Sequence, residues 1–174
     1  MNIYLLILLR AIHIFAGGLW LGSAIAYLFF VKPSVYAIGP AGPQFMQSLM
    51  ERRRYPIFMI GSSLLTVLAG LILYWNSSGG FSPGWLITGP GLGYTIGSLA
   101  SLVAFVVGNA FIGPLSARMG ALGQQMAAAG RPPSSAQVGE MATLNQKLVR
   151  AEWVDFGMLV LAMLTMATAR YWLF

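Results

Sequence analysis

The sequence predicts an all-α membrane protein: a four-transmembrane-helix bundle that forms one domain over residues 1–174. Of the 174 residues, 57% are hydrophobic and only 8% are charged, whereas a soluble domain carries about 25% charged residues. The apolar residues also form stretches of about 20 residues, the length that crosses a bilayer. A chain of this length therefore leaves no room for a separate soluble domain.

We expect spans at about residues 3–31, 55–75, 91–112 and 153–173. The first stretch is longer than the apolar region of a signal peptide, and Arg10 and His13 interrupt it. We therefore expect a retained helix rather than a cleaved leader.

The loops predict the orientation. The connection over residues 76–90 has no charge, whereas the two other connections are basic. The positive-inside rule places both basic loops in the cytoplasm and both termini outside, in the inner (plasma) membrane. The net charge of +6 then reflects topology and lipid contacts, and nucleic acid is not an expected partner. The basic residues are Lys32, Arg52, Arg53 and Arg54 in the first loop, and Arg118, Arg131, Lys147 and Arg150 in the second.

Parts of the cytoplasmic loops are predicted to be helical. Residues 43–54 carry apolar side chains at helical spacing and predict a short interfacial amphipathic helix. Residues 116–129 are expected to continue the third span, and Ser134 or Ser135 to cap a helix that leads into the fourth. The apolar positions of the interfacial helix are Phe45, Met46, Leu49 and Met50.

Small residues recur every fourth position on two spans and predict close helix packing. They are Gly18, Gly22 and Ala26 on the first span, and Gly89, Gly93, Gly97 and Ser101 on the third.

One face of the first span carries Arg10, His13, Gly17, Trp20 and Ala24, at spacings of three and four residues. Ionisable residues inside a membrane are costly, and they suggest a functional site. His13 is the only histidine, and imidazole can bind haem iron or copper through one nitrogen while the other donates a hydrogen bond.

Gly17 would leave space beside His13 for a flat macrocycle. Arg10, and Arg170 from the last span, could hold the carboxylates of a haem. The alternative is that His13 only donates to a carbonyl of a neighbouring helix, while both arginines extend to the outer headgroups.

A second polar cluster is expected at the cytoplasmic side. It consists of Glu152, Asp155 and Asn109, and we expect ion pairs with the arginines at 52–54, because buried carboxylates are usually paired. A proton or ion path through Asp155 is the functional alternative.

The methionines leave copper binding as an alternative to haem, because thioether is a soft ligand for Cu(I). Cysteine is absent, which excludes disulfides and thiolate metal sites. Neither a nucleotide-binding motif nor a hydrolytic pair is present. The methionines concerned are Met59 on the second span and Met158, Met163 and Met166 on the fourth.

Two stretches resemble known families. His13-Ile-Phe-Ala-Gly-Gly-Leu-Trp20, followed by Gly22, resembles the first helix of HemJ-type protoporphyrinogen oxidases and of CopD-like membrane proteins. Met50-Glu-Arg-Arg-Arg-Tyr55, leading into Leu64-Leu-Thr-Val-Leu-Ala-Gly-Leu71, is similar to the start of the second HemJ-type helix. The resemblance covers roughly residues 10–75.

The HemJ-type resemblance implies haem b ligation by His13. In that family a lysine on the third helix is also essential, whereas the third span here has no lysine, arginine or histidine, and the chain's ending does not match. The resemblance therefore does not imply porphyrinogen oxidation. The CopD-like resemblance implies copper handling at the membrane.

We therefore expect a small HemJ/CopD-like membrane protein that binds haem b through His13, with Arg10, Gly17, Trp20 and Arg170 around it. Its role would be membrane electron transfer or haem-linked redox chemistry, with quinone or an oxidase subunit as redox partner. Methionine, water or a symmetry-related His13 would supply the second axial ligand. The alternatives are copper handling or transport, and a non-catalytic accessory subunit. The expected partners are the bilayer and a homo-oligomer or larger membrane complex, and whether the protein is an enzyme stays open.

Overall fold

The computed structural model describes all 174 residues, and 88% of them are helical with no strands, which confirms the all-α prediction. The α-helices are α1 (Ile3–Ala26), α2 (Lys32–Ala37), α3 (Gly42–Gln47), α4 (Tyr55–Ser77), α5 (Pro83–Leu86), α6 (Gly89–Val107), α7 (Gly113–Ala128) and α8 (Ser135–Thr168). Three π-helical turns (Tyr27–Val31, Ser48–Arg52 and Gly108–Ile112) and two 3-10 turns (Gly39–Ala41 and Ala169–Tyr171) connect or extend them.

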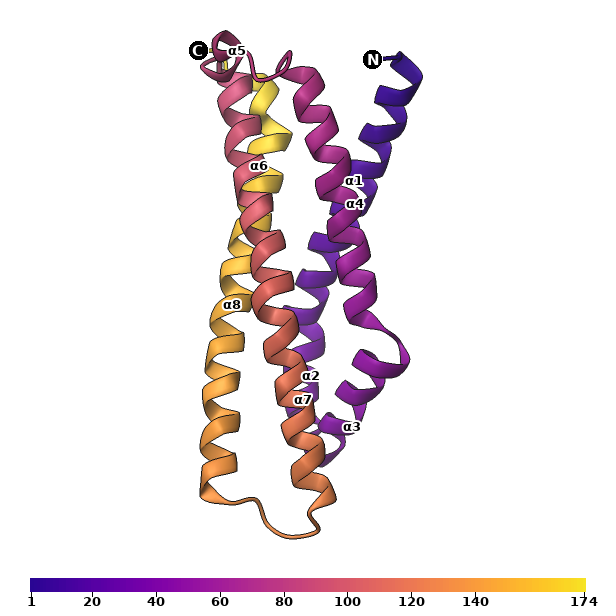
Figure 1. Cartoon of the computed structure of the whole chain (residues 1–174), viewed down its shortest axis with the longest axis vertical. Helices are drawn as coiled ribbons and strands as arrows, with labels where there is room; N and C mark the ends of the chain where they lie inside the picture. The colour runs from indigo at the N-terminus through magenta and orange to yellow at the C-terminus, as the bar shows by residue number, and fades with distance from the viewer.

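The long helices run side by side, and both chain ends lie at the same end of the molecule (Figure 1). Helix α1 continues through a π-turn into α2, and α6 continues in the same way into α7. Three helical segments are long and apolar enough to cross a membrane, namely Ile3–Ala37, Tyr55–Ser77 and Gly89–Ala128. These three segments support the prediction of a membrane protein.

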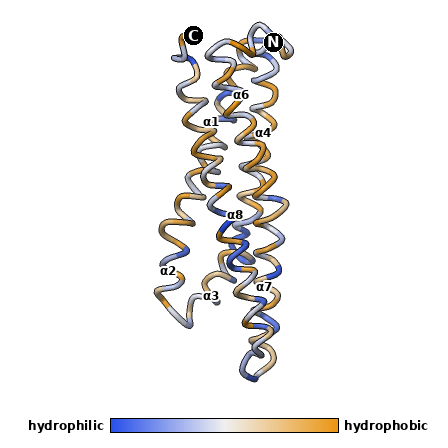
Figure 2. Tube along the Cα trace, turned by 90° about the vertical axis from the view of Figure 1, so that its left-hand side faces the viewer, coloured by the Kyte–Doolittle hydropathy of each residue, from blue (hydrophilic) through white to orange (hydrophobic).

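Helix α8 is not among those three segments, so the predicted fourth span is not confirmed. The physical reason lies in its composition. Its first half is polar, and its apolar half begins only beyond Glu152 and Asp155. Hydrophilic residues gather around the lower parts of α7 and α8, whereas the upper halves of the long helices are mostly hydrophobic (Figure 2).

Helices α6 and α8 form one closely packed pair, and glycines on α6 make the approach possible. A Cβ added at Gly97 would lie 2.6 Å from Met166 Cγ, and one at Gly93 would lie 2.7 Å from Ala169 Cβ. The backbone N–H of Gly89 donates to the carbonyl of Phe174 at 2.9 Å. The predicted packing role of these glycines is therefore confirmed.

Helices α1 and α4 form the second pair, but Gly18 and Gly22 take no part in it. A Cβ added at either glycine would meet nothing within 4 Å, so the predicted packing role is wrong within this chain. The reason is that α1 presents its adjacent face to α4: a Cβ added at Gly17 would lie 3.4 Å from Thr66 Cγ2.

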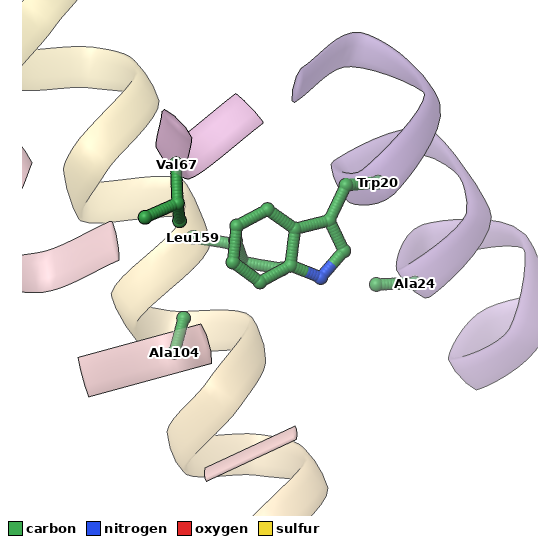
Figure 3. Packing of buried hydrophobic residues seen from close by; sticks show 5 residues of the cluster. All are labelled: Trp20, Ala24, Val67, Ala104 and Leu159. Carbon is green, nitrogen blue, oxygen red and sulfur yellow. The ribbon is translucent and has the colours of Figure 1, made fainter. Parts of the chain in front are cut away.

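Trp20 joins the two pairs at the centre of the bundle. Its side chain is 4% exposed and belongs to one apolar cluster (Figure 3). Because this cluster draws on α1, α4, α6 and α8, it holds the two pairs together at one level. Its buried members are Trp20, Ala24, Val67, Ala104 and Leu159.

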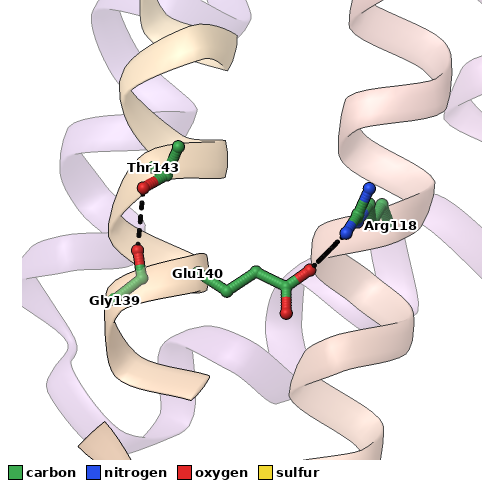
Figure 4. A network of polar contacts seen from close by, with 4 residues as sticks. All are labelled: Arg118, Gly139, Glu140 and Thr143. Atoms are coloured by element: carbon green, nitrogen blue, oxygen red, sulfur yellow. Dashed lines mark hydrogen bonds and ion pairs between the residues drawn. The ribbon is translucent and has the colours of Figure 1, made fainter. Parts of the chain in front are cut away.

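The two basic loops are helical as predicted. Residues 42–52 form α3 and a π-turn, in which Phe45 is exposed while the other three apolar side chains are half-buried; their place at the membrane interface stays a prediction. Ser134 caps α8 with a reciprocal Gln137 contact, as expected for a capping box. Arg118 of α7 pairs with Glu140 of α8 at 2.6 Å, one turn before Thr143 (Figure 4).

Candidate functional site

A cavity of about 680 Å³, called here the outer cavity, lies between the two helix pairs. It is lined by all five predicted binding residues, namely Arg10, His13, Gly17, Trp20 and Arg170. The first four lie on α1, and Arg170 lies in the 3-10 turn that follows α8. Residues 150 or more positions apart in sequence thus meet in one space, on the side of Trp20 nearer the chain ends.

The His13 side chain is oriented by a hydrogen bond across the α1–α4 interface. Its Nδ1 lies 2.8 Å from the carbonyl oxygen of Thr66, and because a carbonyl can only accept, Nδ1 carries the proton. Nε2 then carries the lone pair; it makes no hydrogen bond and is not a buried atom. The expected donation from His13 to a neighbouring carbonyl is confirmed, and it leaves one nitrogen free.

Gly70 of α4 makes room for the imidazole ring. A Cβ at this position would lie 2.8 Å from His13 Cε1 and 3.0 Å from His13 Nδ1, closer than side-chain carbons approach. The ring therefore lies directly against the α4 backbone. Sequence reasoning missed the roles of Thr66 and Gly70. Their spacing of four residues, which puts both on one face of α4, was the available signal.

Arg10 and Arg170 give the cavity wall a positive charge. Both are exposed, and Arg10 makes no hydrogen bond or ion pair. Arg170 donates to the hydroxyl of Tyr171, and its guanidinium carbon lies 4.6 Å from the centre of that ring. No acidic residue lines this cavity. Its wall thus carries two cations and no anion, which suits an anionic ligand.

Of the four methionines considered as copper ligands, Met163 and Met166 line the outer cavity. Met59 lines a different space, and Met158 packs beside the central apolar cluster. No three His, Cys, Asp or Glu side chains come together as a metal-binding group anywhere in the chain. A metal in the outer cavity would therefore depend on one imidazole and on thioether or non-protein ligands.

A second space of about 160 Å³, called here the inner cavity, is lined by Asn109, Glu152 and Asp155, so the predicted cluster forms. The predicted ion pairs with the arginines at 52–54 are wrong, because those side chains are exposed in the turn before α4 and make no ion pair. Glu152 pairs instead with Lys32. The Oδ1 atom of Asp155 has no hydrogen-bond partner.

Comparison of the chain with protein-family models, curated proteins and solved structures found no match. The HemJ-type and CopD-like resemblance therefore rests on the motifs around His13 and before α4 alone. Any role for the protein has to be argued from the geometry of the two cavities.

Proposed function

We propose that the protein binds haem b in the outer cavity through His13 and serves membrane electron transfer or haem-linked redox chemistry. The main support for the proposal is the hydrogen bonding of the His13 ring, which uses Nδ1 and leaves Nε2 free. A metal-ligating histidine commonly donates its other ring N–H to a backbone carbonyl, which fixes the tautomer and the ring orientation. His13 makes this bond to Thr66 and keeps Nε2 available.

The outer cavity suits the ligand in size and charge. Its volume of about 680 Å³ lies within the range of about 300–1,000 Å³ for pockets that enclose small ligands and cofactors. Haem b carries two propionates, and the wall carries two arginines without a carboxylate partner. Guanidinium matches carboxylate geometry, so charge and hydrogen bonding agree.

Each residue then has a defined task. His13 would ligate the haem iron, and Arg10 and Arg170 would hold the propionates. Met163 or Met166 would offer a thioether as a second ligand, with water or a symmetry-related His13 as the other choices. When bound, haem supplies one-electron transfer, and a His/Met ligand pair raises its reduction potential.

The proposed setting is a four-span bundle in the inner (plasma) membrane with both termini outside. The apolar part of α8 together with the residues that follow it, 153–173, would be the fourth span. Two observations support this arrangement: α8 packs on the Gly93 and Gly97 face of α6, and both chain ends lie at one end of the bundle. The outer cavity would then face the outer leaflet.

Copper handling is the second candidate, because Met163 and Met166 line the same cavity as His13. An imidazole with two thioethers is a soft ligand set suited to Cu(I). The third candidate, an accessory subunit, draws support from Gly18 and Gly22, whose open face would let a helix of a partner approach closely.

The absorption spectrum and metal content of the protein purified in detergent separate these candidates. We expect a Soret band and stoichiometric iron, both lost in His13→Ala. Arg10→Gln should lower haem retention, while Arg118→Gln, a matched change at the opposite end of the bundle, should not. Stoichiometric copper without a Soret band would support copper handling, and a colourless, metal-free protein would support an accessory subunit.

A further inference from the structure

The inner cavity, on the other side of Trp20 from the outer cavity, is lined by several side-chain oxygens that can accept hydrogen bonds. Three polar side chains that line it have already given a hydrogen to a backbone carbonyl. Their oxygens can therefore offer only lone pairs to the cavity. The donations are Ser63 Oγ to Ile60 at 3.0 Å, Tyr55 Oη to Ser23 at 3.1 Å, and Asn109 Nδ2 to Phe105 at 2.8 Å.

Asp155 adds an uncompensated carboxylate to this cavity. The residue is 6% exposed, and its Oδ1 has no hydrogen-bond partner. The neighbouring carboxylate of Glu152 is neutralised by Lys32. No cationic side chain pairs with Asp155, and an ionised carboxylate that is buried without a partner is costly.

The backbone beside Asp155 is irregular. The π-helical turn Gly108–Ile112 joins α6 to α7, and a Cβ at Gly108 would lie 3.8 Å from Asp155 Oδ1. Such turns are frequent at functional sites. The π-turn beside the carboxylate therefore marks the surroundings of Asp155 as a candidate site.

We infer that the inner cavity binds one monovalent metal cation, with Asp155 as its anionic ligand and Asn109, Ser63 and Tyr55 as neutral oxygen ligands. A single uncompensated charge matches a monovalent ion, whereas calcium sites draw six to eight oxygens and usually more carboxylates. The volume of about 160 Å³ is far above the roughly 10–15 Å³ that one water requires. The ion can therefore keep several waters.

A proton on Asp155 is the competing occupant. Tyr27, Tyr55 and Glu152 line the same cavity, and Lys32 pairs with Glu152. The test is the melting temperature of the full-length protein in detergent, at fixed ionic strength and mildly alkaline pH. Sodium chloride is titrated against N-methylglucamine chloride. We expect a saturating rise in melting temperature with sodium that is absent in Asp155→Asn and kept in Glu140→Gln, a matched change at an exposed carboxylate.

Equal sodium responses in wild type and Asp155→Asn would overturn the inference. So would a melting temperature that follows pH but is the same in both salts, because that result assigns a proton. If Asp155→Asn does not fold, Asn109→Leu serves as second variant, and equilibrium binding of radioactive sodium should fall from one ion per chain in wild type to none. The readout does not involve colour, so failure here leaves the haem proposal untouched.

Discussion

Gly70→Ala probes the contact on which the haem proposal depends. The added Cβ would lie 2.8 Å from His13 Cε1, so either the imidazole or the α4 backbone must move. Because the neighbouring Nδ1 donates to Thr66 at 2.8 Å, movement of the ring also strains that hydrogen bond. The expected result is loss of both stability and ligand retention.

The magnitude follows from opposing contributions. Overpacking costs about 1–3 kcal/mol, and weakening the hydrogen bond costs about 0.5–1.5 kcal/mol. Alanine gains up to about 1 kcal/mol over glycine in a helix. Gly61→Ala on the same helix carries only that gain, because nothing lies within 4 Å of its added Cβ. That gain is common to both variants, so Gly70→Ala should be less stable than Gly61→Ala by about 1.5–4.5 kcal/mol.

The measurement is reversible unfolding of both variants in mixed micelles, followed by helix content, with ligand retention recorded on the same samples. Equal unfolding free energies for the two variants would refute the placement of His13 against α4. A stability loss in Gly70→Ala with unchanged ligand retention would support the contact between His13 and α4 but contradict its role in ligand binding.

Three further changes test the rest of the fold. Lys32→Met should destabilise the protein by about 3–5 kcal/mol because it leaves the Glu152 carboxylate buried and unpaired; adding Glu152→Gln should restore most of the loss, and no restoration would contradict the ion pair. Gly97→Ala should cost about 1–3 kcal/mol through overpacking between α6 and α8, whereas Gly120→Ala, with open space around it, should not; a thermal melt compares them. Ser134→Ala should cost about 0.5–2 kcal/mol and speed amide exchange in the first turn of α8, and unchanged exchange would exclude the capping role.

Local signals in the sequence predicted much of this structure. The spacing of Arg10, His13, Gly17 and Trp20 placed them on one face, and the structure brings all four to one cavity. The serines at positions 134 and 135 predicted the start of the helix that leads into the fourth span, and α8 begins at Ser135. Such features depend on residues within one or two helical turns, so the sequence displays them directly.

Pairings between distant segments could not be predicted. Lys32 and Glu152 lie 120 residues apart, and nothing in the sequence prefers this pair over the arginines before α4. The orientation of α1 decided that Gly17 rather than Gly18 faces α4. Rotating a helix by one residue changes which stripe is buried, and only the packed bundle fixes that rotation.

The central claim is that His13 Nε2 ligates haem in the outer cavity. Its most direct test is chemical rescue of His13→Ala, in which haem is added to the purified variant and the Soret spectrum is recorded with and without imidazole. We predict that His13→Ala loses the wild-type spectrum and that imidazole restores it, because the ring then occupies the vacated space beside Thr66 and Gly70. A His13→Ala variant that retains the wild-type spectrum without imidazole would contradict the claim.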